Sequence, residues 1–219
     1  MTMTADSIRI SLEELIAREA SQRAIKVSAS DFYNRTYTLQ LAEFVRLREK
    51  RAWTVDDVLM RFCSVYGWMP RGIQEWNVDA VPALALLLNQ DEPDFDALIR
   101  TANRCINNSI VGASKFLHFF DPHCYPIFDS VVASRWWPTW DASKALSRYL
   151  LYWEGVLTVG DEAAMAAQSW AKNWMGYEVS GIRAIEALAF YTQRALKRGS
   201  PPVSVTQLDC DDDIRGRTD

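Results

Sequence analysis

The sequence predicts an all-α protein, and three observations support this fold class. Apolar residues recur every three or four positions along most of the 219-residue chain, which is the spacing of one buried helix face. Serine, threonine, asparagine or aspartate stands before many of these apolar runs, where helix N-caps are expected. Long alternating apolar and polar stretches, which would indicate strands, are missing. We therefore expect roughly nine or ten short helices in one compact or two-lobed domain over residues 1–198.

The helix starts can be placed from capping residues. Thr54, followed by two aspartates, caps one predicted helix, Asn77 caps the next, and Pro93 with Asp94 opens a third. The apolar pattern does not distinguish helix from strand at residues 31–37, with the sequence DFYNRTY, and this is the only such segment. In chain order, the predicted helices cover residues 10–25, 39–47, 55–66, 78–88, 94–106, 113–120, 130–136, 142–157, 161–174 and 180–198.

Composition and termini limit the class of protein. Apolar residues make up 49% of the chain and charged residues 24%, which is typical of a globular domain with a real core. No apolar run reaches the roughly 18 residues of a membrane span. The start, MTMTADSIRI, lacks the basic-then-apolar order of a signal peptide. We expect a cytoplasmic protein without a membrane partner.

The cysteine and histidine pattern predicts neither a metal nor a cofactor. The only histidines, His118 and His123, are five residues apart across a proline, which is poor metal-ligand spacing on a helix. The cysteines lack CxxC or CxxH spacing and are interpreted as reduced thiols, mostly in the core. They are Cys63, Cys105, Cys124 and Cys210.

Charge is uneven along the chain. Residues 199–219 contain five aspartates against two arginines, so this tail carries −3 of the net charge of −4. Its serine, proline and aspartate content predicts a disordered, acidic end. The remaining body is nearly neutral, which argues mildly against a nucleic-acid partner held by net charge alone.

The segment 107–112 predicts a tight polar turn between two helices. Backbone N–H groups at the start of the following helix, with the helix dipole behind them, suit a phosphate oxygen. The candidate DNA contacts are therefore Asn108, Ser109, Val111 and Gly112, with Asn108 as the left-handed residue. The alternative is an ordinary helix–helix connection.

Lys115 and Asp129 are the candidate catalytic residues. Lys115 follows Gly112 by three residues, and Asp129 opens the next predicted helix. If these helices pack side by side, the amine and the carboxylate face one small volume. The alternatives are that Asp129 only caps its helix and that Lys115 is a solvated surface lysine.

This order of elements over about residues 94–136 resembles the helix-hairpin-helix DNA glycosylase superfamily, in particular its 8-oxoguanine glycosylase-like branch. The resemblance implies that Asp129 takes the place of the catalytic aspartate. It also implies that Lys115 takes the place of the lysine found in members that nick the strand. The sequence departs from the family pattern at Ile110, which stands where the first hairpin glycine is usual, and at Ser130.

The chemistry of N-glycosidic cleavage requires these residue types. Positive charge develops on the sugar, and a carboxylate near C1′ stabilises that transition state. A neutral lysine amine can attack C1′ and form a Schiff base, and the start of a helix disfavours the protonated amine. Attack by water instead of Lys115 remains an alternative.

Aromatic residues form the second set of candidates. The chain has nine tryptophans, and flipped bases are held between aromatic faces. We assign Trp68, Trp136 and Trp137 to a base pocket, with core packing as the alternative for each. Arg71, in the loop after Trp68, is a further candidate contact to DNA.

The resulting expectation is a monomeric DNA glycosylase that flips and excises a modified base, with AP-lyase activity if Lys115 is the nucleophile. An oxidised purine in base-excision repair follows from the branch resembled, whereas a hypermodified pyrimidine would indicate anti-phage defence. The alternative is a catalytically silent helical DNA-binding or interaction protein that retains the hairpin. An enzyme requires Lys115 and Asp129 to converge on an open cavity, whereas in a binding module the two residues can be separated and solvated.

Overall fold

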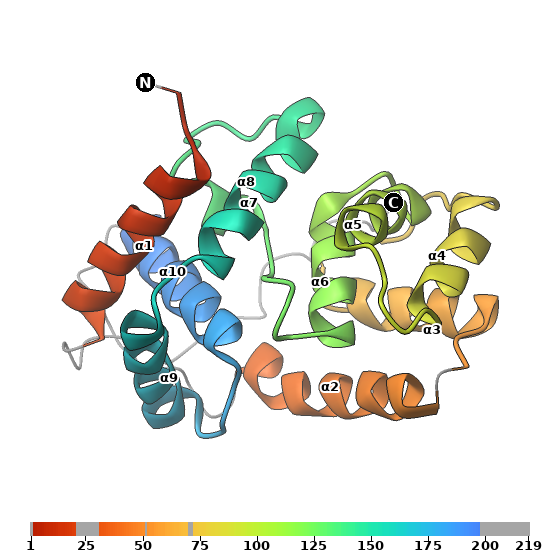
Figure 1. Cartoon of the computed structure of the whole chain (residues 1–219), viewed down its shortest axis with the longest axis horizontal. Coiled ribbons are helices and arrows are strands. Elements are labelled where there is room, and N and C mark those ends of the chain that lie inside the picture. The colour runs from red at the N-terminus through yellow and green to blue at the C-terminus, as the bar shows by residue number, and fades with distance from the viewer. Residues whose placement is uncertain (1, 21–30, 51, 70–71, 198–219) are drawn as a thin grey trace, which may run out of the picture.

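The computed structural model describes residues 2–20, 31–50, 52–69 and 72–197, and it confirms the all-α fold class. Within these ranges the chain forms ten α-helices, one 3-10 turn and no strand (Figure 1). The elements are α1 (Ala5–Glu19), α2 (Phe32–Lys50), α3 (Val55–Tyr66), α4 (Ala80–Leu88), α5 (Phe95–Cys105), α6 (Ile110–Phe120), α7 (Ser130–Ala133), the 3-10 turn η1 (Ala142–Lys144), α8 (Ala145–Leu157), α9 (Asp161–Met175) and α10 (Gly181–Lys197).

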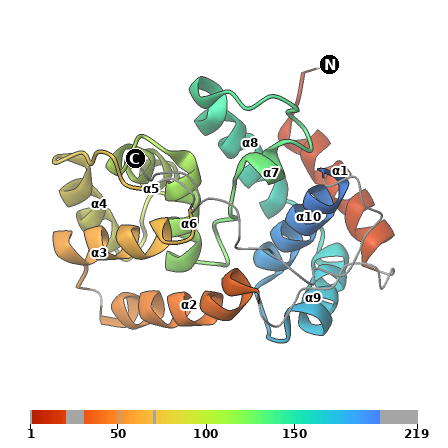
Figure 2. The same ribbon diagram turned by 180° about the vertical axis from the view of Figure 1, so that it is seen from behind.

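The helices pack as two groups, which both views of the chain show (Figures 1 and 2). Helices α2 to α6 contact one another, whereas α1 at the start of the chain packs with α8, α9 and α10. Helix α7 packs on α10 and so belongs to the second group. Helix α6 also contacts α8. The connection from α6 to α7 therefore passes from one group to the other.

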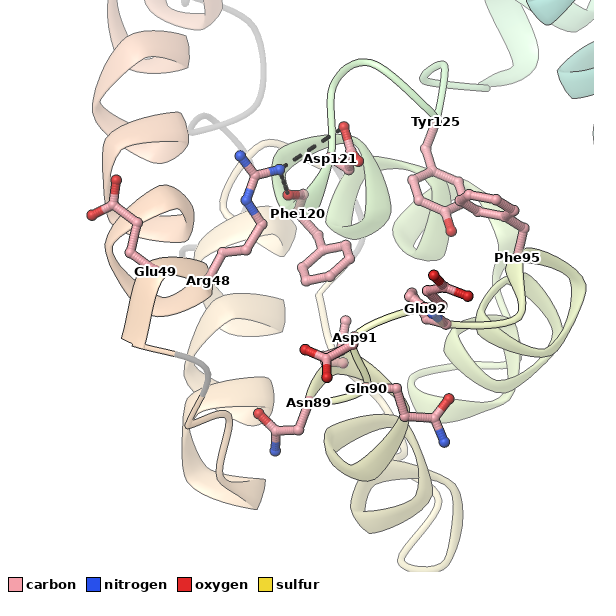
Figure 3. A pocket seen from close by; sticks show the side chains of 12 residues that line it. Arg48, Glu49, Asn89, Gln90, Asp91, Glu92, Phe95, Phe120, Asp121 and Tyr125 are labelled. Carbon is pink, nitrogen blue, oxygen red and sulfur yellow. Dashed lines mark hydrogen bonds and ion pairs between the residues drawn. The ribbon is translucent and has the colours of Figure 1, made fainter.

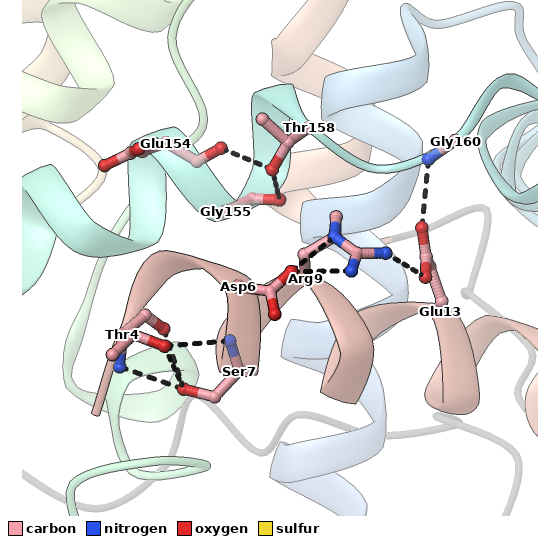
Figure 4. Close-up of polar contacts among 9 residues, drawn as sticks. All are labelled: Thr4, Asp6, Ser7, Arg9, Glu13, Glu154, Gly155, Thr158 and Gly160. Atoms are coloured by element: carbon pink, nitrogen blue, oxygen red, sulfur yellow. Dashed lines mark hydrogen bonds and ion pairs between the residues drawn. The ribbon is translucent and has the colours of Figure 1, made fainter. Parts of the chain in front are cut away.

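Helix α1 is held against the second group by close backbone packing and by polar contacts (Figure 4). A Cβ at Gly155 in α8 would lie 2.8 Å from Ile8 Cγ2, so the glycine permits the two helices to approach closely. Glu13 accepts a hydrogen bond from the Gly160 N–H at 3.1 Å and one from Arg9 at 2.8 Å. The Gly155–Ile8 approach and the Glu13–Gly160 hydrogen bond join α1 to the second group, whereas the Arg9–Glu13 bond lies within α1.

Two of the three predicted capping residues, Thr54 and Asp94, are confirmed as N-caps. Thr54 Oγ1 accepts from the Asp57 N–H at 3.1 Å, and Asp94 Oδ1 accepts from the N–H groups at the start of α5. Asn77 Oδ1 accepts from the Ala80 N–H at 2.9 Å. Helix α4 nevertheless begins at Ala80 with Asp79 as its N-cap residue, so the prediction that Asn77 caps a helix from residue 78 is wrong. Asn77 instead forms a short turn before the helix.

Several further predicted boundaries differ from the structure, among them the start of α1, which lies at Ala5 and not at residue 10. The undecided segment 31–37 is helical from Phe32 onward, and Asp31 Oδ1 accepts from the Asn34 N–H at 2.9 Å in the manner of an N-cap. Helix α7 ends at Ala133 rather than at residue 136. The N–H groups of Arg135 and Trp136 donate to carbonyls three residues earlier, as in a 3-10 turn. The predicted helix 142–157 begins with one 3-10 turn.

The described cysteines are free thiols in different environments. Cys105 is buried, and burial raises the pKa of its thiol to about 12. Cys124 is partly buried, and Cys63 is exposed, which differs from the core position expected for most of them. Cys210 and the acidic tail 199–219 lie outside the described residues, as does the end of the first predicted helix.

In the ranges that the structure describes, no helix is long and apolar enough to cross a membrane.

Candidate active site

The turn between α5 and α6 contains two left-handed residues. Asn107 has φ 54° and Asn108 has φ 44°, so the predicted left-handed conformation of Asn108 is confirmed and Asn107 shares it. The Asn107 side chain accepts hydrogen bonds from the N–H groups of Gln74 and Glu75 and donates one to the Gly72 carbonyl. These hydrogen bonds join the α5–α6 turn to residues 72–75, which precede α4.

Helix α6 starts at Ile110, three residues earlier than predicted. Ser109 is the N-cap residue, and its hydroxyl accepts from the Gly112 N–H at 3.4 Å. Val111 and Gly112 therefore lie in the first helical turn, not in the connecting turn. The expectation that both belong to the turn is wrong, because the serine cap starts the helix before the glycine.

Gly112 is buried against a tyrosine. A Cβ at this position would lie 2.7 Å from the ring and hydroxyl of Tyr66. The Tyr66 hydroxyl donates to the Ile106 carbonyl at 3.2 Å, so α3 is hydrogen-bonded to the residue that precedes the turn. The space left by the absent side chain is therefore occupied by Tyr66 and is not open to a phosphate group.

The other predicted DNA contacts differ in exposure. Asn108 is exposed, and its Oδ1 accepts from Asn103 Nδ2 at 2.9 Å. Ser109 and Val111 are partly exposed. Arg71 lies outside the described residues. For Asn108, Ser109 and Val111, contact with DNA stays a prediction.

Ser114 brings the two predicted catalytic segments together. Its buried hydroxyl donates to the Phe128 carbonyl at 3.2 Å and accepts from the Phe128 N–H at 3.1 Å. Ser114 precedes Lys115 on α6, and Phe128 precedes Asp129. This pair of hydrogen bonds holds Lys115 and Asp129 on neighbouring segments at the junction of the two helix groups.

Asp129 is held by the backbone at the start of α7. Its Oδ1 accepts from the N–H groups of Val131 at 2.8 Å and Val132 at 2.9 Å. The predicted N-cap role is therefore confirmed. Because both bonds go to one carboxylate oxygen, the other oxygen remains available for a second role.

Lys115 is partly buried on α6, and burial lowers the pKa of its amine. The negative charges of Asp129 and Glu186 oppose this shift. Among the described residues, the ion pairs within 4.0 Å do not include one between Lys115 and Asp129. The amine and the carboxylate therefore make no direct ion pair.

A second carboxylate, missed from the sequence, lies in the same cluster. Glu186 is 2% exposed on α10 and forms an ion pair with Arg183, one turn earlier and 7% exposed. Burial and the charge of Asp129 raise the pKa of Glu186 to about 7, against the opposing effect of Arg183. The available signal was two opposite charges within residues 182–190 of the last predicted helix, where all the other residues are apolar.

The aromatic residues after α7 pack near this cluster. Trp136 contacts Tyr152 and Trp137, with ring centroids 5.6 Å and 6.1 Å apart. Tyr152 is fully buried, and burial with the charges of Glu186 and Asp129 raises the pKa of its hydroxyl. Both tryptophans are partly exposed. Their role in a base pocket stays a prediction.

Trp68 occupies a different place from the one expected. It follows α3 in a turn, but its side chain is only 5% exposed and packs edge-on against Tyr33 and Phe119. A ring enclosed in this way stabilises the α2–α6 group and does not present a face to a base. We therefore do not include Trp68 in the proposed pocket.

A pocket of about 680 Å³ lies between the end of α2, the α4–α5 connection and the end of α6 (Figure 3). Neither Lys115 nor Asp129 lines it. Arg48 donates to the Phe120 carbonyl and pairs with Asp121 at 4.0 Å, and the other charged groups of the lining are acidic. This lining does not suit a DNA phosphate.

The Lys115–Asp129 cluster combines an amine of lowered pKa with a carboxylate held by backbone N–H groups. Such a pair can supply a nucleophile and can stabilise developing positive charge. Comparison of the chain with protein-family models, curated proteins and solved structures finds no match.

Proposed function

We propose that the protein is a DNA glycosylase that excises a modified base by cleaving its N-glycosidic bond. The observation that carries this proposal is the Ser114–Phe128 hydrogen-bond pair, which joins the segments that contain Lys115 and Asp129. A lysine and an aspartate on separate helices, both partly buried, are the groups that this chemistry requires.

Asp129 is the electrostatic group in the proposed mechanism. As the glycosidic bond breaks, positive charge develops at C1′ and on the ring oxygen of the sugar. The Asp129 oxygen that accepts no hydrogen bond from α7 stabilises this charge. The two N–H bonds to the other oxygen prevent the side chain from turning away, so little reorganisation is needed during the reaction.

Lys115 is the nucleophile in the proposed mechanism. Burial lowers the pKa of its amine and so raises the neutral, reactive fraction near neutral pH. The amine nitrogen forms a bond to C1′ as the bond from C1′ to the base breaks, and the base leaves with the bonding pair. Ring opening then gives a Schiff base, from which β-elimination nicks the strand. If water attacks instead, Lys115 forms no covalent adduct.

The start of α6 is the proposed DNA contact. The N–H groups of its first turn, apart from that of Gly112, can bind a phosphate without a large positive charge on the protein, together with the exposed Asn108 and the partly exposed Ser109 side chains. Trp136 and Trp137, which lie shortly after Asp129 in the chain and contact each other, are the aromatic residues proposed to hold a flipped base. We expect either an oxidised purine or a hypermodified pyrimidine, the second indicating a role in anti-phage defence.

An excision screen tests the proposal. Duplex oligonucleotides that carry 8-oxoguanine, 5-hydroxymethylcytosine or its glucosylated form are incubated with the wild type and with Lys115→Ala. A duplex with an abasic site is added with borohydride. We expect release of one base by the wild type, and a trapped adduct that Lys115→Ala abolishes.

The control for this screen is Lys172→Ala, which removes an exposed lysine paired with Glu178 on the surface. This variant should retain base release and adduct formation. If the wild type releases no base from the panel and forms no adduct on abasic DNA, the result favours the catalytically silent binding protein.

A further inference from the structure

The pocket between α2, the α4–α5 connection and α6 takes no part in the proposed reaction, and its charges are unbalanced (Figure 3). One guanidinium, that of Arg48, stands against the carboxylates of Glu49, Asp91, Glu92 and Asp121 in the lining. Three of these carboxylates lie around the same space in Figure 3, and we call Asp91, Glu92 and Asp121 the facing carboxylates. The Glu49 carboxylate points away from them. The balance of charge in the pocket favours a cation.

Three helices end at this pocket, and their ends add to its negative potential. Helix α2 ends at Lys50, α4 at Leu88 and α6 at Phe120, and each contributes residues of its last turn or its C-cap to the lining. The last carbonyls of a helix have no intrahelical donor, and the helix dipole places partial negative charge there. The start of α5 has the opposite polarity, but Asp94 Oδ1 already accepts from its first N–H groups. The helix ends therefore favour a cation that donates hydrogen bonds.

Tyr125 is an independent indication of a ligand. It lines the pocket with 0% of its surface exposed, and in Figure 3 its hydroxyl points into the pocket on the side of Glu92. Among the described residues, this hydroxyl has no hydrogen-bond partner. Burial raises the pKa of the hydroxyl, so it stays neutral and can accept a hydrogen bond. A buried hydroxyl without a partner lowers stability, so a bound donor at this point would remove that cost.

The lining favours an elongated organic cation over a metal ion. In the part of the chain that the structure describes, no group of three His, Cys, Asp or Glu side chains is arranged to hold a metal. The facing carboxylates are therefore spread out, as separate ammonium groups require. Leu88, Phe95 and Phe120 add apolar surface for methylene groups, and aromatic faces attract cations. Phe95 is 44% exposed and packs on the Tyr125 ring with centroids 6.0 Å apart, so rotation of this surface side chain gives access to the hydroxyl.

We propose that this pocket binds an aliphatic polyamine. Its ammonium groups bind the facing carboxylates and the carbonyls at the helix ends, and its methylene groups pack on the aromatic rings. One ammonium group donates a hydrogen bond to the Tyr125 hydroxyl. Neither Lys115 nor Asp129 lines the pocket, so the inference goes beyond the proposed glycosylase activity and does not depend on it.

Titration calorimetry of the full chain with spermidine tests the proposal, without DNA because polyamines also bind phosphates. We expect one spermidine to bind per chain at low salt. The double variant Asp91→Asn with Glu92→Gln should weaken binding about tenfold, because each exposed charge pair contributes up to about fivefold. Glu49→Gln removes the same charge from the same lining, but its carboxylate points away, so it should weaken binding less than about twofold. The acidic tail is unchanged in every variant, so spermidine bound there would be unaffected.

Tyr125→Phe tests the hydroxyl separately, because it keeps the ring. We expect spermidine to bind this variant about tenfold more weakly, while chemical denaturation of the ligand-free variant shows no loss of stability. A loss of stability would mean that the hydroxyl already has a partner, and it overturns the inference. So does wild-type affinity in both Tyr125→Phe and the Asp91 and Glu92 double variant, or no binding of spermidine at about 1 mM. If Mg²⁺ displaces spermidine at the same concentration of charge, the pocket acts only as diffuse negative charge and the proposal is refuted.

Discussion

Replacing Asp129 with asparagine separates the two roles of this residue. Asparagine keeps an oxygen that can accept from the N–H groups of Val131 and Val132, so α7 remains capped. The lost interaction is that of a negative charge with the helix N-terminus, which is worth about 0.3–1 kcal/mol. We expect the free energy of unfolding of Asp129→Asn to stay within about 1 kcal/mol of the wild type.

The effect on base release should be much larger. A carboxylate about 4–5 Å from a unit positive charge contributes about 3–4 kcal/mol at an effective dielectric constant of about 20. Each 1.36 kcal/mol corresponds to about tenfold in rate, so Asp129→Asn should slow base release by roughly 10²–10³-fold. Because the partly buried site excludes some water, this charge is not fully screened.

Although Asp129→Asn should slow base release, it should make the Lys115 amine more reactive. The negative charge of Asp129 raises the pKa of the Lys115 amine, so its removal should increase the neutral fraction. On a duplex that already contains an abasic site, no base has to leave. Asp129→Asn should therefore form the borohydride-trapped adduct at least as readily as the wild type, with a midpoint at lower pH.

Single-turnover base release, adduct trapping and chemical denaturation are measured on the wild type and on Asp129→Asn. Asp129→Ala serves as the control, because it loses the cap as well and should be less stable than Asp129→Asn by about 1 kcal/mol. If Asp129→Asn releases the base at the wild-type rate on a verified substrate, the mechanism is wrong. If both variants are equally destabilised, the capping argument fails.

Three further predictions concern stability and charge. Gly112→Ala should lower the free energy of unfolding by about 1–3 kcal/mol, because the added Cβ would meet Tyr66. Gly72→Ala, with open space around the added Cβ, should not lower it. Denaturant titration of both variants checks this prediction. Burial lowers the pKa of His118 to about 3, so the unfolded chain binds the proton first, and stability should fall by about 1.4 kcal/mol per pH unit below about 6.5. His118→Gln should remove this slope. Deleting residues 199–219 removes a net charge of −3 and should tighten DNA binding at low salt in a filter-binding assay.

Local features of the fold could be predicted from the sequence, because they depend on residues close together in the chain. The apolar period of three to four residues indicated the helices, and Thr54 and Asp94 identified two of their starts through bonds to N–H groups two or three positions away. Asp129 was identified as a cap in the same way. The start of α6 was missed because the glycine was taken as part of the turn and the Ser109 cap was overlooked.

The arrangement of the candidate site depended on contacts between distant parts of the chain. Gly112 faces Tyr66, 46 positions earlier, so its function in packing could not be read from its neighbours. Ser114 joins Phe128 across the α6–α7 connection, and Glu186 reaches the cluster from the last helix. Burial sets the charge of Lys115 and Glu186, and burial is a property of the packed helices. The sequence alone therefore determined which chemical groups are present, and only the tertiary structure decided which of them share one site.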